Sequence, residues 1–302
     1  MQPIKLTPAL KDYLWGGNRL KTEFKTESDL DKIAEAWVLS CHPDGPSTAD
    51  GVPLCEIIEE LGEECLGTKG ADFPFFPILI KLIDAQKPLS IQVHPSDEYA
   101  LKEENQFGKP EMWYIVDCDE GASLYYGFNR EISREEFSER IKNDTLLEVL
   151  NKVPVKKGDC FFIDSGTIHA IGAGILIAEI QQNSNCTYRV YDYGRVGADG
   201  KPRELHVDKA LAVTKTTPPE YPFGAPQDDT LASCKFFTVV RHKINGEKTL
   251  SVGSESFAAY LCTEGEAELD GVHLAKGECA FVPAYYGELK ISGNAEILES
   301  RV

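Results

Sequence analysis

The sequence lacks the features that place a chain in a membrane, on nucleic acid or in a disulfide framework. No stretch approaches about 18 uninterrupted apolar residues, and the first residues do not combine a basic flank with an apolar run. Lysine and arginine number 31 against 49 acidic residues, and the net charge of −18 disfavours nucleic acid or anionic membrane as a partner. The nine cysteines are scattered singly, without a Cys-x-x-Cys pair. We therefore expect a cytoplasmic protein with reduced thiols, no signal peptide and no membrane span.

Short segments rich in β-branched and aromatic residues dominate the chain of 302 residues. Gly, Pro or Asp turns separate them, a pattern typical of strands in an antiparallel sandwich or barrel. With 42% hydrophobic residues, the chain can bury the core of one large domain or two ordinary ones. The predicted strands are Phe76–Ile83, Leu89–Val93, Met112–Val116, Asp159–Ile163, Ile175–Ile180, Thr187–Tyr193, Phe236–Val240, Phe257–Cys262 and Glu278–Val282.

Helical signals are confined to two segments. Residues 54–66 carry an apolar stripe at helical spacing. Residues 131–150 are predicted to form two short helices, because they contain two capping-box patterns, Ser133 with Glu136 and Thr145 with Glu148. We treat both segments as insertions between strands.

A proline-rich stretch and an internal repeat divide the chain. Residues 216–229 hold four prolines, which predicts a linker between a domain over residues 1–218 and a second over residues 219–302. KKGDCFFIDSG, from Lys156, and AKGECAFVPAY, from Ala275, share a Lys-Gly-acid-Cys start, a β run and a turn. A similar strand pair precedes each copy. One β module has therefore been used twice.

The first copy continues into a motif that resembles the second motif of the cupin superfamily. Five residues separate Gly158 from Asp164, where cupins usually have proline, and Gly166 and His169 follow at cupin spacing. The resemblance implies two jelly-roll β-barrel modules and a metal site closed by His169. It also implies that the other ligands are Gln92, His94 and Glu111. The second copy has Glu288 in place of the histidine, so we expect it to keep the fold without the metal.

The segment LSIQVHPSDE places polar side chains on one face of a predicted strand. Ser90, Gln92 and His94 alternate with Leu89, Ile91 and Val93, so the polar set should line the inside of the barrel. Two imidazoles, a carboxylate and a candidate amide oxygen suit Zn²⁺, while Mn²⁺, Fe²⁺ and Co²⁺ stay open. Few protein ligands leave room for a substrate oxygen, which favours a catalytic site.

Several basic residues accompany the predicted metal site. Lys109 stands two residues before Glu111, and Arg189 and Arg195 share a face of an extended segment. Lys81 and Lys87 flank LIDAQ. In a chain of net charge −18, cations beside a metal site are candidates for holding an anionic substrate.

Taken together, these motifs resemble the type I mannose-6-phosphate isomerases of the short bacterial branch, over essentially the whole chain. The resemblance rests on LWGG at Leu14, EAWVLS at Glu35, KPLSIQVHPSDEYA at Lys87, GKPEMWYI at Gly108, DSGTIHAIGAGI at Asp164 and QNSNCTYRVYDYGR at Gln182. It implies an enzyme with one Zn²⁺ per chain that interconverts mannose 6-phosphate and fructose 6-phosphate through an enediol. The implied metal ligands are Gln92, His94, Glu111 and His169.

The resemblance also implies roles for the polar residues around the metal. Arg189 and Lys109 would be catalytic. The substrate or its phosphate would be bound by Ser90, Lys81, Lys87, Arg195 and Asn185, although longer relatives tend to have Asp at the position of Asn185. The general base stays open between a zinc-bound hydroxide, a carboxylate that is not a ligand and Lys109 with a depressed pKa. We expect a monomer or homodimer.

Three alternatives come from other functional classes. A cupin of this kind could be an isomerase of unphosphorylated sugars, or an Fe²⁺ dioxygenase that consumes oxygen. It could also be a sugar-binding regulator, but the acidic chain shows no DNA-binding segment.

Overall fold

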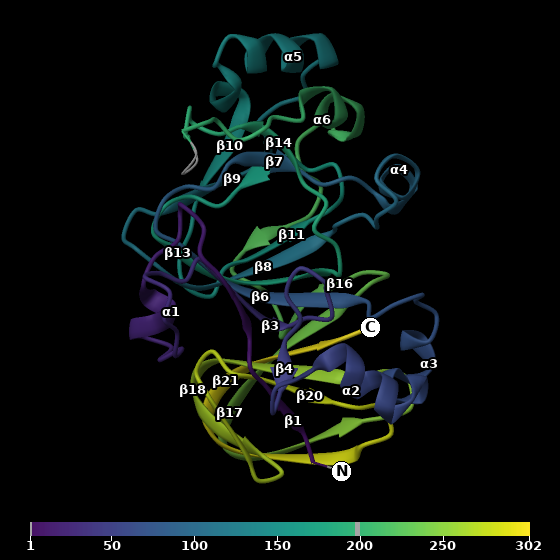
Figure 1. Cartoon of the computed structure of the whole chain (residues 1–302). Coiled ribbons are helices and arrows are strands. Elements are labelled where there is room, and N and C mark those ends of the chain that lie inside the picture. Colours follow the sequence, from purple (N-terminus) through teal and green to yellow (C-terminus); the bar gives the residue numbers. More distant parts are fainter. Residues whose placement is uncertain (1, 197–199) are drawn as a thin grey trace.

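The computed structural model describes residues 2–196 and 200–302, and within these ranges most strands fall into three sheets (Figure 1). The outer sheet has the order β10 (Leu150–Pro154), β9 (Ser123–Phe128), β12 (His169–Ala170), β7 (Ile91–Val93), β14 (Tyr188–Tyr191). The central sheet has the order β15 (Phe223–Gly224), β11 (Cys160–Ile163), β8 (Glu111–Cys118), β13 (Ile175–Gln182), β6 (Ile78–Ala85), β3 (Glu35–Leu39), β2 (Ala9–Lys11).

The C-terminal sheet has the order β1 (Ile4–Leu6), β20 (Cys279–Val282), β18 (Ala258–Leu269), β21 (Gly287–Arg301), β17 (Thr238–Val252), β16 (Thr230–Ser233), and β19 (Val272–Ala275) pairs with β18. Strands β4 (Thr48–Ala49) and β5 (Val52–Pro53) form a separate pair. The mainly β fold class is confirmed, and every predicted strand has a counterpart among these elements. No described helix is long and apolar enough to span a membrane.

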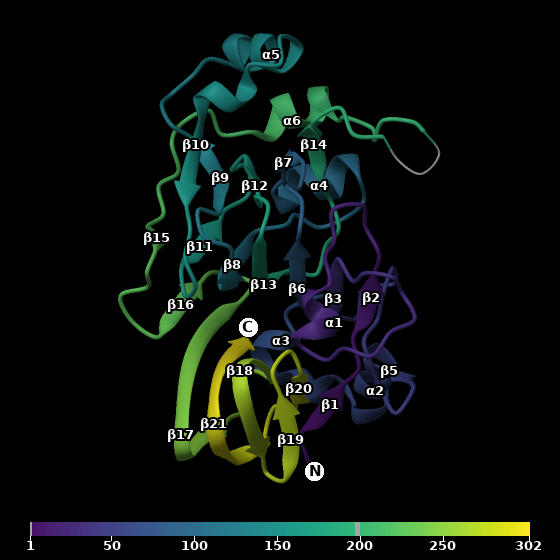
Figure 2. The same ribbon diagram turned by 90° about the vertical axis from the view of Figure 1, so that its left-hand side faces the viewer.

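The sheets are stacked in layers, which Figures 1 and 2 show from two directions. Trp113 and Ile115 of β8 pack with Leu124 and Tyr126 of β9 between the central and outer sheets. Helices α5 (Arg134–Lys142) and α6 (Val207–Val213) cover the far face of the outer sheet (Figure 1). The first module therefore encloses its own interior and is covered by short helices on one side.

The C-terminal module packs against the opposite side of the central sheet. Met112 and Tyr114 of β8 point away from the interior of the first module and share a core with Phe257, Phe281 and Leu298. Strands of the central sheet are therefore buried on both faces, which explains their nearly continuous apolar sequences. The C-terminal module supports the sheet from behind, and it has its own separate core between its strands.

The predicted repeat is confirmed by strand register and turn hydrogen bonds. Cys160 lies opposite Tyr114 in the first copy, as Cys279 lies opposite Leu261 in the second. The acid of each turn caps it in the same way: the Lys156 N–H donates to Asp159 and the Ala275 N–H donates to Glu278. The register that places Glu111 opposite Ile163 places Ala258 opposite Val282. The second copy thus has alanine where the first has the predicted carboxylate ligand.

The predicted helices are present but shorter than expected. The segment 54–66 divides at Gly62, where φ is +86°, into α2 (Leu54–Leu61) and a 3₁₀ helix (Glu63–Leu66), followed by α3 (Gly67–Gly70). The segment 131–150 contains α5 and a 3₁₀ helix (Leu146–Val149). Four of the described helices had not been predicted: α1 (Arg19–Thr22), α3, α4 (Asp97–Glu103) and α6.

One capping prediction is confirmed and the other is wrong. Ser133 Oγ accepts the N–H of Glu136 at 3.1 Å at the start of α5, whereas Thr145 makes no side-chain cap bond. The Ser133→Ala variant should therefore lose about 1 kcal/mol of the free energy of unfolding, because an N–H in the first turn loses its acceptor. Thr145→Ala is the matched control and should lose less. Urea unfolding of both variants checks this; equal losses would contradict the assignment.

The predicted domain boundary at residue 218 stays a prediction. Two strand pairings join the regions on either side of it. Strand β1 pairs with β20 of the C-terminal sheet, while β15 pairs with β11 of the central sheet. Figure 1 shows the N-terminus beside the C-terminal module. Each proposed domain therefore contributes one strand to a sheet of the other.

Candidate metal centre and active site

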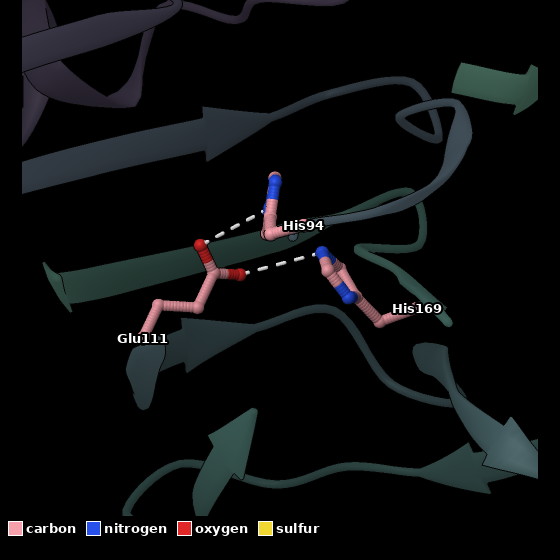
Figure 3. A group of neighbouring side chains, drawn as sticks. All are labelled: His94, Glu111 and His169. Carbon is pink, nitrogen blue, oxygen red and sulfur yellow. Dashed lines mark ion pairs between the residues drawn. The ribbon is translucent and has the colours of Figure 1, made fainter. Parts of the chain in front are cut away.

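Three predicted metal ligands meet in the interior of the first module. One donor atom each from His94, Glu111 and His169 lies within 4.8 Å of the other two, and all three side chains are fully buried. Each Glu111 oxygen is 3.4 Å from one imidazole Nε2. The dashed lines in Figure 3 mark these two pairs. His94 follows β7 and His169 lies in β12 of the outer sheet, whereas Glu111 opens β8 of the central sheet. The cluster therefore joins the two sheets across the interior.

Backbone carbonyls fix the tautomers of both histidines. His94 Nδ1 donates to Cys186 O at 2.9 Å and His169 Nδ1 donates to Thr167 O at 2.8 Å. Because a carbonyl only accepts, both Nδ1 atoms carry the proton, and both Nε2 atoms keep a lone pair facing Glu111. This is the orientation that metal-binding imidazoles have in proteins.

The donor set fits a divalent cation. Glu111 Oε1 and His169 Nε2 are buried without a hydrogen-bond partner among the described residues. A buried polar atom that lacks a partner is costly, and a cation between these atoms would satisfy both. Burial, together with the Lys109 ammonium, lowers the pKa of His94 to about 4, so this imidazole is neutral and available as a ligand.

Lys109 lies against the same donors. Its Nζ is 2.7 Å from Glu111 Oε2 and 3.2 Å from His94 Nε2. Burial alone would lower the pKa of Lys109, but the carboxylates of Glu111 and Glu179 outweigh it and raise the pKa. Conversely, burial would raise the pKa of Glu111, yet Lys109 and His94 hold it well below its usual range. Without a metal, Lys109 is therefore an ammonium, and the alternative of a depressed pKa is not supported.

We call His94, Glu111 and His169 the metal-type cluster. Charged residues of alternating sign continue from this cluster across the central sheet. The buried charge ladder consists of Glu111, Lys109, Glu179, Lys81 and Glu35. Its Lys–Glu distances range from 2.7 to 3.8 Å, and all five residues are buried. Three carboxylates and two ammonium groups leave one negative charge in the interior, which favours a bound cation.

Glu179 and Glu35 were missed by sequence reasoning. Glu179 Oε2 accepts from Trp113 Nε1 at 2.9 Å, and its backbone lies opposite Lys81 in the sheet register. A signal did exist, because each of ILIKLIDA and ILIAEIQQ carries a charged residue within an apolar strand. Their pairing could not be predicted, because it depends on which strands are neighbours. Lys81, predicted near the phosphate, lies instead in the ladder between Glu35 and Glu179.

A second polar group lies along the inner strands next to the metal-type cluster. The register of β7 places Gln92 opposite both His169 and Arg189. Ser90 Oγ is 3.4 Å from Gln92 Oε1 and 3.2 Å from Arg189 Nε. The structure therefore brings Ser90 and Gln92 together, as predicted from their alternation, and adds Arg189 to them. Ile91 and Val93 pack toward the helices, but Leu89 packs in the interior core, because β7 begins only at Ile91.

The remaining predicted residues lie at different places. Arg195 is half-buried, and its Nη1 donates to Pro88 O at 2.6 Å, close in sequence to Ser90. Lys87 is exposed, and its backbone N–H donates to Trp15 O. Asn185 Nδ2 donates to Asp44 at 3.2 Å. Both residues line a cavity of about 1140 Å³ that does not include Ser90 or Arg189.

Loop contacts hold Lys109 next to the histidine strand. The Gly108 N–H donates to Asp97 Oδ1 at 2.8 Å, and the Lys109 N–H donates to Pro95 O at 3.1 Å. A Cβ at Gly108 would lie 2.5 Å from the Asp97 nitrogen, so only glycine permits this approach. The HPSD and GKPE motifs are thus two sides of one contact.

The fold and this site define a two-module cupin protein with a buried His-Glu-His centre of the metal-binding type. The family model for the type I phosphomannose isomerase catalytic domain matches residues 4–121, and that for the mannose-6-phosphate isomerase cupin domain matches residues 227–302. The mannose-6-phosphate isomerase of Streptococcus mutans is 36% identical to this chain, covering 99% of the chain and 98% of the relative. The mannose-6-phosphate isomerase ManA of Bacillus subtilis is also 36% identical, covering 100% and 99%.

The solved structures agree with these matches. The crystal structure of mannose 6-phosphate isomerase from Bacillus subtilis superimposes with a TM-score of 0.90 at 34% identity, covering both chains completely. The chain belongs to the type I phosphomannose isomerase family, as its motifs had indicated.

Proposed function

We propose that this chain is a zinc-dependent aldose–ketose isomerase that interconverts mannose 6-phosphate and fructose 6-phosphate through an enediol. The observation that carries the proposal is the convergence of His94, Glu111 and His169 within 4.8 Å, with two buried donor atoms left unpartnered. Family membership supports the same reaction. The adjoining Ser90–Arg189 pair supports an anionic substrate.

The chain would hold one zinc ion through His94, Glu111, His169 and Gln92. Imidazole nitrogens and a carboxylate are donors that zinc accepts, and no thiolate is involved. When bound, the ion would act as a Lewis acid toward the C1 and C2 oxygens of the sugar. Trp113 helps to maintain the donor set. Its ring packs edge-on against the His169 ring, with 5.3 Å between the ring centroids, while its Nε1 donates a hydrogen bond to Glu179.

Two cations of the chain would act on the reacting sugar. Arg189 lies opposite Gln92 in the strand register, and its guanidinium is permanently charged, so it can stabilise negative charge that develops on the enediol oxygens. Lys109, an ammonium beside Glu111, can donate a hydrogen bond to the same oxygens. Both residues would orient the open-chain sugar for proton transfer.

Glu179 is our candidate for the base that moves the proton between C2 and C1. It is the carboxylate of the ladder that lies next to Lys109 without belonging to the metal-type cluster. Its Oε1 lacks a hydrogen-bond partner among the described residues, whereas its Oε2 is held by Trp113. Oε1 lies 3.4 Å from Lys81 Nζ and 3.7 Å from Lys109 Nζ without a hydrogen bond to either, and it is the oxygen through which Glu179 would reach the migrating proton.

The phosphate would be anchored away from the reacting carbons by Ser90 and Arg195, with Lys87 at the exposed rim. Binding energy from this remote group would position the sugar and increase turnover. Discrimination between mannose 6-phosphate and mannose then follows from these cations. A sugar without phosphate would leave their charge unmatched.

A single assay tests the proposal. The zinc-loaded, chelator-treated and zinc-restored protein is given mannose 6-phosphate in D₂O, and fructose 6-phosphate and deuterium at carbon are measured. We expect turnover that requires zinc, with solvent deuterium entering the sugar, because a proton leaves and returns during the reaction. Mannose is the matched substrate and should react far more slowly.

Each alternative function has its own outcome in this experiment. Equal turnover of mannose and mannose 6-phosphate would favour an isomerase of unphosphorylated sugars. Oxygen consumption by the Fe²⁺-loaded protein, without isomerisation, would favour a dioxygenase. Either result would overturn the proposal.

A further inference from the structure

A cluster of three arginines surrounds one buried carboxylate at the edge of the outer sheet. Asp192, only 6% exposed, follows β14 and accepts from two guanidinium groups. Arg203 Nε donates to Asp192 Oδ2 at 2.8 Å and Arg203 Nη2 donates to Oδ1 at 2.6 Å. Arg195 also donates to Asp192 through Nε, at 3.1 Å, and through Nη2. Asp192 therefore holds both arginines in place.

The chain returns to β14 in a way that brings Arg203 beside Arg189. The His206 N–H donates to Arg189 O at 2.7 Å, and the Arg189 N–H donates to His206 Nδ1 at 3.3 Å. Arg189 Nη1 donates to Glu204 O at 3.0 Å. Since β14 is the edge strand of the outer sheet, residues 203–206 cover that edge and are tethered to Arg189 at three points. The position of Arg203 is thus built into the fold.

The cluster carries more positive charge than its own contacts neutralise. Arg189, Arg195 and Arg203 contribute three positive charges, and Asp192 and the neighbouring Glu204 contribute two negative charges, so one positive charge is left in excess. Burial lowers the pKa of Arg189, and the positive charges of Arg203 and Arg195 act in the same direction, against the carboxylates of Asp192 and Glu204. The side-chain hydrogen bonds found for Arg189 and Arg203 among the described residues use Nε and Nη1 of Arg189 and Nε and Nη2 of Arg203. Their other N–H groups, together with the Ser90 hydroxyl next to Arg189, leave the cluster suited to an anion.

We propose that Arg203 is a substrate-binding residue that completes, with Arg195, the site for the phosphate of the sugar next to Arg189, and that Asp192 is the positioning residue that organises it. The proposal rests on the proposed function and adds a residue that neither the motifs nor the metal centre indicated. The excess positive charge and the planar guanidinium donors suit the oxygens of a phosphate monoester. The cluster is distinct from the buried charge ladder, which carries excess negative charge and would repel phosphate.

The test replaces Arg203 by alanine and by lysine and measures KM, kcat and inhibition by inorganic phosphate. Arg203→Ala should raise KM for mannose 6-phosphate and the inhibition constant of phosphate by roughly 10- to 100-fold, because a charged hydrogen bond to the phosphate is lost. kcat should change much less. Arg203→Lys keeps the charge but loses the planar fork of donors. Its KM and its inhibition constant for phosphate should therefore lie between those of the wild type and of Arg203→Ala. Arg130→Ala is the matched control, because that exposed arginine pairs with Glu136 on α5.

The outcomes separate this inference from the proposed function. If the wild-type protein isomerises mannose 6-phosphate but both Arg203 variants keep the wild-type KM and phosphate inhibition, the inference is overturned. A fall in kcat with unchanged phosphate inhibition would show a purely structural role and would overturn it too. If the wild-type protein lacks isomerase activity, the proposed function fails. Phosphate should even then raise the melting temperature of the wild type and of Arg130→Ala but not of Arg203→Ala, and equal shifts would overturn the inference.

Discussion

Replacing His169 by alanine is expected to abolish both metal retention and isomerase turnover. His169 Nε2 is one of three donors within 4.8 Å of one another, and no other described group of this kind contains it. Loss of that donor leaves Glu111 with one imidazole, and the remaining set holds zinc poorly. Since Lewis-acid stabilisation contributes several kcal/mol, turnover should fall by about 10³-fold or more. Bound zinc per chain after dialysis and the rate with mannose 6-phosphate measure the two effects.

The internal repeat supplies the control for this variant. Glu288 occupies the position of His169 in the second copy, and its side chain is exposed. Glu288→Ala should therefore keep wild-type zinc content and wild-type turnover. Full zinc content and normal turnover in folded His169→Ala would contradict the metal assignment.

Replacing Arg189 by alanine should separate catalysis from metal binding. Arg189 touches Ser90 and Glu204 but is not among the donors of the metal-type cluster. The variant should keep one zinc per chain, while turnover falls by roughly 10²- to 10³-fold, because a preorganised charge that stabilises the enediol is lost. Zinc analysis and kcat on the same preparation provide the measurement.

The control for Arg189→Ala is another partly buried arginine that lies outside the site. Arg241 pairs with Asp229 at 3.0 Å at the junction of the linker and the C-terminal module. Arg241→Ala should leave both zinc content and turnover unchanged. If Arg189→Ala loses its zinc, the residue has a role in the metal centre and our assignment is wrong.

Much of the metal centre could be predicted from the sequence because its signals are local. The alternation of Ser90, Gln92 and His94 identifies one face of a strand, and that face does line the interior. The repeat identifies His169 by its distance from Gly158, and the second copy shows which positions the fold itself does not require. Local spacing, strand period and turn chemistry were sufficient for these residues.

The partners of these residues could not be predicted, because they come from strands that are distant in the chain. Lys81 and Glu179 are 98 positions apart and meet only because β6 and β13 are neighbours in the central sheet. The same holds for Arg203, which approaches Arg189 through the edge of the outer sheet. Sequence reasoning could assign Lys81 a charge but not the two carboxylates that neutralise it.

The C-terminal module shows the same difference between what the sequence could predict and what it could not. Its sequence predicted a copy of the first β module without a metal, but not its position. The structure places its strands behind the central sheet, where Phe257 and Phe281 share a core with Met112, on the face opposite Glu111. Strand β1 joins this sheet, although it lies at the other end of the chain.

The sequence by itself determined the β character of this protein, its duplicated module, the three residues of its His-Glu-His cluster and its family. These properties follow from residue spacing along one strand or one turn. The tertiary structure alone decided the buried charge ladder, the arginine cluster around Asp192 and the supporting role of the second module. These depend on which strands lie side by side, and strand pairing is set by the packing of the whole chain rather than by any one segment.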